Sequence, residues 1–194
     1  MRKWKRDLLR LRQKIKQERN RINMTSQTLR EARKYEEASE KMIKQEERPD
    51  FHLSVRTGWM NDPNGFSYYN GQYHLFYQYN PYAPRWDSMH WGHAVTKDFL
   101  HWDYLPAALA PDEAYDRDGC FSGSALTLPD GRQLLMYTGV LRERKENGEH
   151  CDMQTQCLAV GDGVDYEKCE RNPVLDKADI PEGGSVHDFR DPKM

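Results

Sequence analysis

Two aspartates in this chain each stand directly before a proline. Asp62 lies in the segment WMNDPNG, residues 59–65, and Asp191 lies in FRDPK, residues 189–193. Because proline disfavours the helical region for the residue before it, we expect both aspartates on extended backbone with a restricted carboxylate direction. Aromatic and polar side chains flank both. The two segments together predict an acid-based active site that is cut short where the chain ends.

The composition narrows the class of protein. The chain has 194 residues, which predicts one or two domains, and it contains no run of ~18 apolar residues, so we expect no membrane span. The N-terminus is basic but no apolar stretch follows it, so we expect no secretory signal and a cytoplasmic location. The cysteines show no Cys-x-x-Cys pairing, which favours cytosolic thiols over a disulfide framework or a zinc site: Cys120, Cys151, Cys157 and Cys169.

The charge divides the chain into two parts. Residues 1–48 hold 16 Lys and Arg against 8 Asp and Glu, whereas residues 49–194 hold 13 against 23. The first part has no proline or glycine and a composition that favours helix, so we expect a charged helical extension over residues 1–48. Its apolar stripe is thin and consists of Trp4, Leu8, Leu11, Ile15 and Ile22.

Three interpretations of this extension stay open. A basic arm could bind nucleic acid, but the interleaved opposite charges favour a solvated helix with no nucleic-acid partner. Met24 could also be the true start of the protein in place of Met1.

After residue 50 the pattern changes to β-strands. An Asn70-Gly71 turn and an Asp162-Gly163 turn each separate two strand-like segments, and Pro129-Asp130-Gly131 does the same between them. The expected strands are 66–69, 72–79, 90–96, 102–109, 121–128, 132–140, 155–160 and 164–169. Two successive four-strand meanders predict an all-β fold, namely two blades of a larger β-propeller.

Five motifs occur in one order along residues 51–194. They are WMNDPNG at 59–65, FYQYNP at 76–81, HWGHA at 90–94, FSGS at 121–124 and FRDPK at 189–193. In these motifs the chain resembles the invertase and sucrose-6-phosphate hydrolase family, glycoside hydrolase family 32. The resemblance implies a five-bladed β-propeller, of which residues 49–194 would supply two blades and the start of a third.

The resemblance also implies a role for each matching residue. Asp62 matches the nucleophile that attacks the fructosyl anomeric carbon, and Asp191, with Arg190 beside it, matches the carboxylate that stabilises the transition state. Substrate-contacting positions are matched by Trp59, Met60, Asn61, Gln78, Trp86, Phe121, Ser122 and Arg190. The implied ligand is a small sugar (sucrose, sucrose 6-phosphate or a fructan), with no cofactor.

Other residues of the same types have simpler interpretations. The histidines show no metal-ligand spacing, so we expect no metal site, and we interpret His93 as a core residue. Strand packing is favoured over ligand contact for Tyr73, Phe76, Tyr77 and Tyr79.

A retaining glycosidase needs a second carboxyl group as general acid. In the family this is a glutamate of a Glu-Cys motif located after the Arg-Asp-Pro segment, and Cys169-Glu170 has the wrong order and position. We therefore expect a truncated β-fructofuranosidase that is inactive alone and lacks a C-terminal half. Two alternatives stay open: a non-catalytic sugar-binding remnant or split-enzyme subunit, and a basic helical interaction module.

Overall fold

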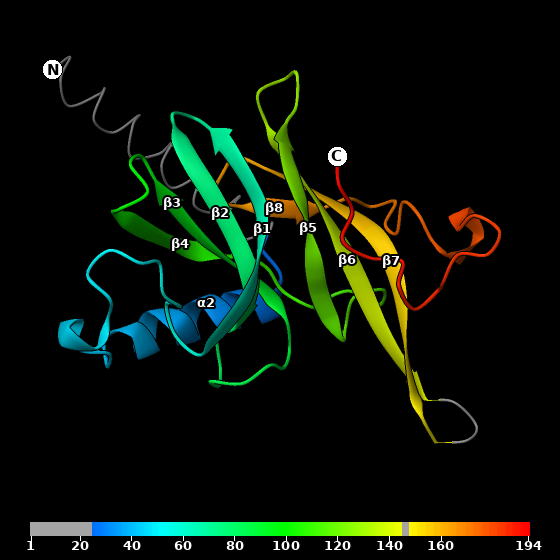
Figure 1. Cartoon of the computed structure of the whole chain (residues 1–194), viewed down its shortest axis with the longest axis horizontal. Coiled ribbons are helices and arrows are strands. Elements are labelled where there is room, and N and C mark those ends of the chain that lie inside the picture. Colours follow the sequence, from blue (N-terminus) through cyan, green and yellow to red (C-terminus); the bar gives the residue numbers. More distant parts are fainter. Residues whose placement is uncertain (1–24, 145–147) are drawn as a thin grey trace, which may run out of the picture.

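The computed structural model describes residues 25–144 and 148–194, and these form two four-stranded antiparallel sheets and one α-helix (Figure 1). The first sheet consists of β1 (Trp59–Tyr69), β2 (Gln72–Asn80), β3 (His90–Thr96) and β4 (Trp102–Leu109). The second consists of β5 (Gly119–Thr127), β6 (Gln133–Arg144), β7 (His150–Gly161) and β8 (Tyr166–Lys168). The helix is α2 (Gln27–Glu40), and two short 3₁₀ helices are η1 (Gln45–Glu47) and η2 (Lys177–Asp179).

The predicted pair of meanders is confirmed, because in each sheet the strands are hydrogen-bonded in sequence order. β3 and β4 have the predicted bounds. The turn between β1 and β2 consists of Asn70 and Gly71, with φ of 49° and 81°. Positive φ at both positions is the geometry of a type I′ hairpin, which Asn-Gly favours.

The predicted strand bounds differ most from the structure in two places, at the start of β1 and at the β6–β7 hairpin. β1 begins at Trp59 rather than Phe66, so the whole WMNDPNG segment belongs to the strand. The β6–β7 hairpin extends to the pair Arg144 and His150, well beyond the predicted ends at Val140 and Thr155. There, the cross-strand pair of Arg142 and Asp152 supports pairing that apolar periodicity does not indicate.

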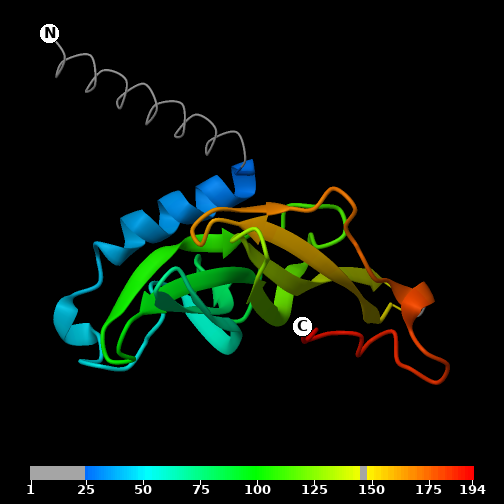
Figure 2. The ribbon, with the colours of Figure 1, turned by 90° about the horizontal axis from the view of Figure 1, so that it is seen from above.

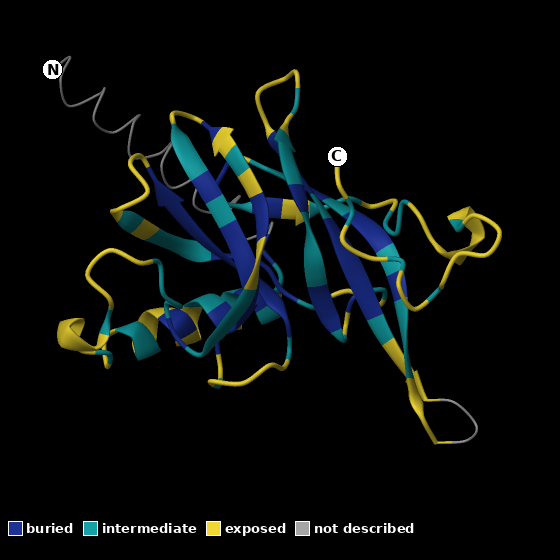
Figure 3. Ribbon diagram, in the orientation of Figure 1, coloured by how far each residue is buried: buried dark blue, intermediate teal, exposed yellow. Residues whose placement is uncertain are grey.

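The two sheets pack against each other through their first strands, β1 and β5, and through a shared apolar cluster (Figure 3). Phe76 and Trp91 of the first sheet and Tyr137 of the second are fully buried in this cluster. Two side chains of the first sheet also donate hydrogen bonds to the backbone of β5. Trp91 Nε1 donates to the carbonyl of Phe121 at 3.1 Å, and Gln78 Nε2 donates to that of Cys120 at 3.0 Å.

The described helix differs from the expected solvated extension, because one side of α2 packs on the protein (Figure 2). Its buried residues are Leu29, Ala32 and Glu36. Arg33 connects the two sheets, since Nε donates to the carbonyl of Ala107 at 2.9 Å and Nη1 pairs with Asp165 at 2.7 Å. Because the packed side of α2 includes the charged residues Arg33 and Glu36, apolar periodicity in the sequence does not reveal it.

The residues of the expected N-terminal stripe, Trp4 to Ile22, and Met24 lie outside the described residues. Within 25–144 and 148–194, every helix is too short or too polar to cross a membrane.

Glu36 is the most buried acidic side chain of α2, with only 1% of its surface exposed. Its Oε1 accepts hydrogen bonds from Arg56 Nη1 and from the backbone N–H of Ala107, both at 3.0 Å. Burial raises the pKa of this carboxyl, while the Ala107 and Arg56 contacts act in the opposite direction. The residue thus fixes the helix to β4 and to the segment that leads into β1.

We expect Glu36→Ala to lower the free energy of unfolding by about 3 kcal/mol, because it leaves the largely buried Arg56 with one fewer carboxylate partner. Urea unfolding measures this change. Glu37→Ala is the matched control, since Glu37 is the next residue along the helix, is exposed and pairs only with Lys41 in the contacts of the described chain. Equal losses in the two variants would show that α2 is not anchored through Glu36.

Three histidines of the first sheet belong to its interior. His93 is fully buried, as the sequence predicts, stacks on Phe76 at 4.1 Å between ring centroids, and lies 3.0 Å from His74 through Nε2 and Nδ1. Burial lowers the pKa of His93 and of His74. Burial also lowers the pKa of His90 to about 4, although its Ser88 carbonyl contact acts in the opposite direction. All three side chains are therefore neutral at pH 7.

The lowered pKa of His90 predicts a loss of stability in mild acid. The unfolded side chain takes up a proton near pH 6.5 and the folded one only near pH 4, so stability is fully present above 6.5 and is lost as the pH falls. This residue alone should remove about 3 kcal/mol between these values. His90→Gln should flatten the pH dependence of urea unfolding, whereas His52→Gln, at an exposed position, should not. Parallel curves for His90→Gln and the parent would contradict this account.

Candidate active site

A cavity of about 560 Å³ lies between the two sheets and the C-terminal segment. It brings together most of the residues that the sequence singled out. Its lining includes Asn61, Asp62, Gln78, Trp86, Phe121, Ser122, Arg190 and Asp191. The two Asp-Pro aspartates, which are distant in sequence, therefore share one cavity.

An irregularity in β1 directs two consecutive side chains into this cavity. Met60 pairs with Tyr79 and Pro63 with Tyr77, so Asn61 and Asp62 together lie opposite the single residue Gln78. Such a bulge interrupts the strict alternation of side chains, and it also accommodates proline within a strand. Asn61 and Asp62 both line the cavity as a result.

β5, which contacts β1, contains a second irregularity at the cavity. Phe121 pairs with Thr138 and Gly123 with Tyr137, which leaves Ser122 as the extra residue. Phe121 and Ser122 consequently both line the cavity. Gly123 is required here, because a Cβ at this position would lie 1.9 Å from the carbonyl oxygen of Met136.

The aromatic part of the lining comes from Trp86 and Phe121. Their rings meet edge to face with centroids 5.9 Å apart, and the guanidinium of Arg142 lies 5.8 Å from the centre of the Trp86 ring. Trp86 remains 46% exposed although it is a large apolar side chain. An exposed indole beside a cavity suits packing against the C–H face of a sugar ring.

The two carboxylates are held differently. Ser122 Oγ donates a hydrogen bond of 3.4 Å to Asp62 Oδ2, so the two bulged strands meet at this aspartate. The backbone N–H of Asp191 donates to Thr138 Oγ1 at 3.0 Å, and Arg190 Nε lies 3.6 Å from Asp191 Oδ2. Both aspartates remain exposed and open to a ligand.

The expected extended backbone is correct for Asp62, which lies in β1, but wrong for Asp191, whose φ is 59°. The following proline disfavours the right-handed helical region for Asp191, and aspartate tolerates the left-handed region better than most residues. Neighbouring contacts fix this conformation. Gln156 Nε2 donates to the carbonyl of Phe189 at 2.6 Å, and Ser124 Oγ donates to that of Pro192 at 2.9 Å. The second sheet thus positions the C-terminal segment (Figure 1).

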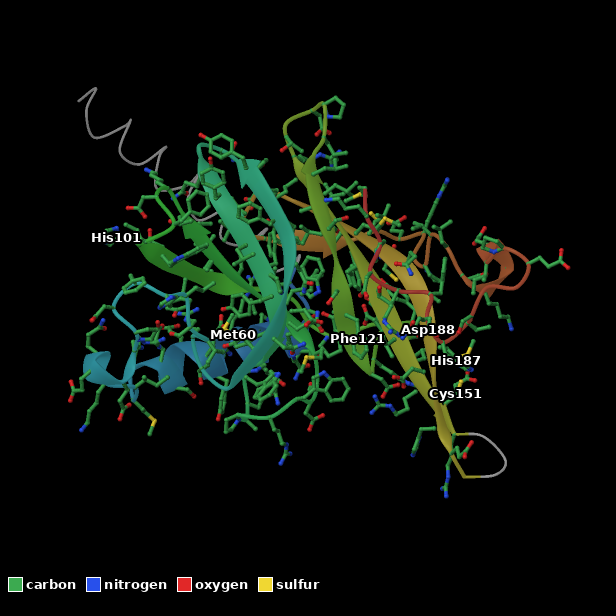
Figure 4. The ribbon with its side chains drawn as sticks, viewed as in Figure 1. Met60, His101, Phe121, Cys151, His187 and Asp188 are labelled. Atoms are coloured by element: carbon green, nitrogen blue, oxygen red, sulfur yellow. The ribbon has the colours of Figure 1, made fainter. Side chains whose placement is uncertain are left out.

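Two predicted substrate contacts lie outside the cavity lining. Trp59 Nε1 donates to Asn61 Oδ1 at 3.0 Å, so the indole orients a lining residue. Met60 packs instead against the apolar cluster that contains Tyr77, Tyr79 and Leu29 of α2 (Figure 4). The assignment of Met60 as a contact residue stays a prediction, and the packing of its side chain in this apolar cluster does not support it.

Several lining residues were not predicted: all but His187, which belongs to the C-terminal segment, lie in the parts of β6 and β7 beyond their predicted ends. They are Arg142, His150, Cys151, Asp152, Gln154 and His187. Arg142 Nε donates to Asp152 Oδ1 at 2.9 Å, and Cys151 Sγ lies 3.1 Å from His187 Nδ1 (Figure 4). In the described parts of the chain, no three His, Cys, Asp or Glu side chains are grouped so as to hold a metal ion.

The arrangement combines carboxylates, amides, one hydroxyl and two arginines with an aromatic wall. These groups match the alternating hydroxyl and C–H surfaces of a sugar. Within the described lining, the carboxyl groups belong to Asp62, Asp152 and Asp191. Glu170 lies at a different cavity, beside Cys169 and Arg171, and so it does not supply an acid here.

Comparison with known proteins agrees with this geometry. The family model described as "Glycosyl hydrolases family 32 N-terminal domain" matches residues 52–194. The sucrose-6-phosphate hydrolase of Zymomonas mobilis is 45% identical over 158 residues, which are 81% of this chain and 30% of that protein.

Solved structures show the same likeness. The Bombyx mori GH32 beta-fructofuranosidase is 41% identical with a TM-score of 0.71, over 84% of this chain and 32% of that one. A mutant of it in complex with sucrose is 40% identical, with the same TM-score and coverage. The chain spans about a third of the length of these relatives. Its motifs, its two sheets and the matched residues 52–194 show that the chain belongs to glycoside hydrolase family 32.

Proposed function

We propose that this chain is the N-terminal part of a β-fructofuranosidase that hydrolyses sucrose or sucrose 6-phosphate with retention of configuration. The observation that carries the proposal is the shared cavity of Asp62 and Asp191, with an aromatic wall at Trp86 and Phe121. The named activity of the Zymomonas mobilis relative and the sucrose complex of the Bombyx mori mutant support the choice of sugar.

In the proposed mechanism, Asp62 is the nucleophile. A carboxylate oxygen of Asp62 attacks the anomeric carbon of the fructosyl unit, the bond to the glucosyl oxygen breaks, and an ester between fructose and Asp62 forms. Water then hydrolyses this ester and regenerates the carboxylate. The Ser122 hydroxyl that donates to Asp62 Oδ2 orients the attacking group.

Asp191 and Arg190 would bind fructosyl hydroxyls and stabilise the positive charge that develops on the sugar ring. Their placement supports this role, because both line the cavity and Arg190 Nε lies 3.6 Å from Asp191 Oδ2. Asn61 and Gln78 supply amide groups in the same cavity. The leaving glucosyl oxygen needs a proton, and we propose that a glutamate outside residues 1–194 supplies it.

The two sheets fit the proposal as the first two blades of a five-bladed β-propeller. β1 and β5 would be the inner strands, since they contact each other and carry Asp62 and Ser122. Residues 1–48 would form an extension whose helix α2 braces the two blades through Arg33.

Sucrose and sucrose 6-phosphate differ by one phosphate group, so a free basic side chain in the cavity would distinguish them. The two arginines of the cavity already contact carboxylates, Arg142 at Asp152 and Arg190 at Asp188 and Asp191. Sucrose, sucrose 6-phosphate and fructan therefore all remain within the proposed substrate class. A cytoplasmic location is likewise part of the proposal and is supported by four free cysteines.

The nucleophile can be tested without the general acid, by using a fructoside whose leaving group needs no protonation. Incubation of the 194-residue chain with an aryl β-fructofuranoside should release the phenol and add the mass of one fructosyl unit to the peptide that contains Asp62. Asp62→Asn should abolish both signals, because an amide is a poor nucleophile. Intact-protein and peptide mass spectrometry measure the adduct.

Asp103→Asn is the matched control, since Asp103 is exposed on β4 and outside the cavity, and it should label like the parent chain. Sucrose should give no glucose above background, because its leaving group requires protonation worth roughly 10²–10⁴-fold. Phenol release that persists in Asp62→Asn would exclude Asp62 as the nucleophile. Sugar binding without any adduct would favour the sugar-binding remnant instead.

A further inference from the structure

Gln154 of β7 has a buried acceptor without a partner. Only 3% of the residue's surface is exposed, and its Oε1 makes no hydrogen bond within the described chain. The residue also lines the cavity that contains Asp62 and Asp191. A buried carbonyl oxygen without a hydrogen-bond donor lowers the stability of the fold. A packed apolar side chain at the same position would not carry this cost, so the fold gains nothing from the amide oxygen of Gln154.

The other buried glutamines do not share this feature. Gln133 donates to Ser67 Oγ and accepts from the Tyr166 hydroxyl. Gln156 donates to the carbonyl of Phe189, and Gln78 donates to that of Cys120. Each of these amides connects two parts of the fold, whereas the Oε1 atom of Gln154 connects none within the described residues.

The position of Gln154 along β7 explains what its acceptor can meet. Asp152 and Gln156 are two residues away on either side, and so they lie on the same face of the strand. Asp152 lines the cavity, and Gln156 holds the segment that carries Asp191. Gln154 therefore lies between the Arg142–Asp152 ion pair and the C-terminal segment, at a buried part of the cavity wall.

We propose that Gln154 is a specificity-determining residue whose Oε1 accepts a hydrogen bond from a hydroxyl group of the bound sugar. The inference rests on the proposed function, since it assigns a further contact within the same site. An acceptor of this kind needs a ligand with a hydrogen-bond donor. A sugar ring has such a donor, a hydroxyl group, at almost every carbon. It discriminates against a ligand that presents an ether or a C–H group at that point, because the acceptor is then left buried and unpaired.

The test compares sugar affinity and stability in one variant. Gln154→Met keeps the length of the side chain and removes the acceptor. Titration of the 194-residue chain with sucrose, followed by the backbone amide signals of the cavity residues in NMR spectra, should show affinity reduced about tenfold. The thermal unfolding midpoint should stay the same or rise by about 2–4 °C, because a buried unpaired oxygen is removed.

Gln45→Met is the control, since Gln45 is exposed in η1 and outside the cavity, and it should bind sucrose like the parent chain. Unchanged affinity in Gln154→Met would overturn the inference while leaving the proposed function intact. A lower unfolding midpoint would also overturn it, because it would show that Gln154 serves the fold. If the parent chain itself binds neither sucrose nor fructose, the proposed function fails, and the inference fails with it.

Discussion

The packing of the first sheet on the second is the constraint on which the site depends. Apolar contact between Phe76, Trp91 and Tyr137 brings the sheets together, but apolar contact alone does not fix how one strand is offset against another. The hydrogen bonds from Trp91 and Gln78 to successive carbonyls of β5 supply that register. Because donors and acceptors are buried, a shift by one residue would leave them unpaired, and this cost holds Ser122 beside Asp62.

Local irregularity then turns this register into a site. A regular strand would send Asn61 and Asp62 to opposite faces, and likewise Phe121 and Ser122. The bulges of β1 and β5 place all four on the cavity. The left-handed backbone of Asp191 and the unpaired acceptor of Gln154 are two further departures from ideal structure at the same place. Such departures concentrate at functional sites because the surrounding fold holds them there.

The sequence predicts the regular parts of this fold well, because their signals are local. Strand alternation and the Asn70-Gly71 turn fix the hairpins without reference to the rest of the chain. The aspartates could be singled out because of their long flanking motifs. The resemblance carried the roles of Asn61, Trp86 and Phe121, and the structure places these three in the cavity lining.

The features that the sequence did not reveal are set by contacts between segments that are distant in the chain. The packed side of α2 includes Glu36, whose partners Arg56 and Ala107 come from later in the chain, so no apolar stripe marks it. The β6–β7 hairpin extends on polar pairs, and thus Gln154 was not recognised as a lining residue. Met60 was assigned to the site because it stands in the motif, although the strand turns it toward the helix cluster.

We propose that the two sheets build one sugar site from Asp62 and Asp191. The most direct measurement is a crystal structure of the 194-residue chain with fructose bound. We expect one fructose in the cavity whose hydroxyl groups contact both carboxylates, with its ring against Trp86 or Phe121. A fructose bound elsewhere, or two carboxylates too far apart to contact the same ring, would show that Asp62 and Asp191 do not form one sugar site.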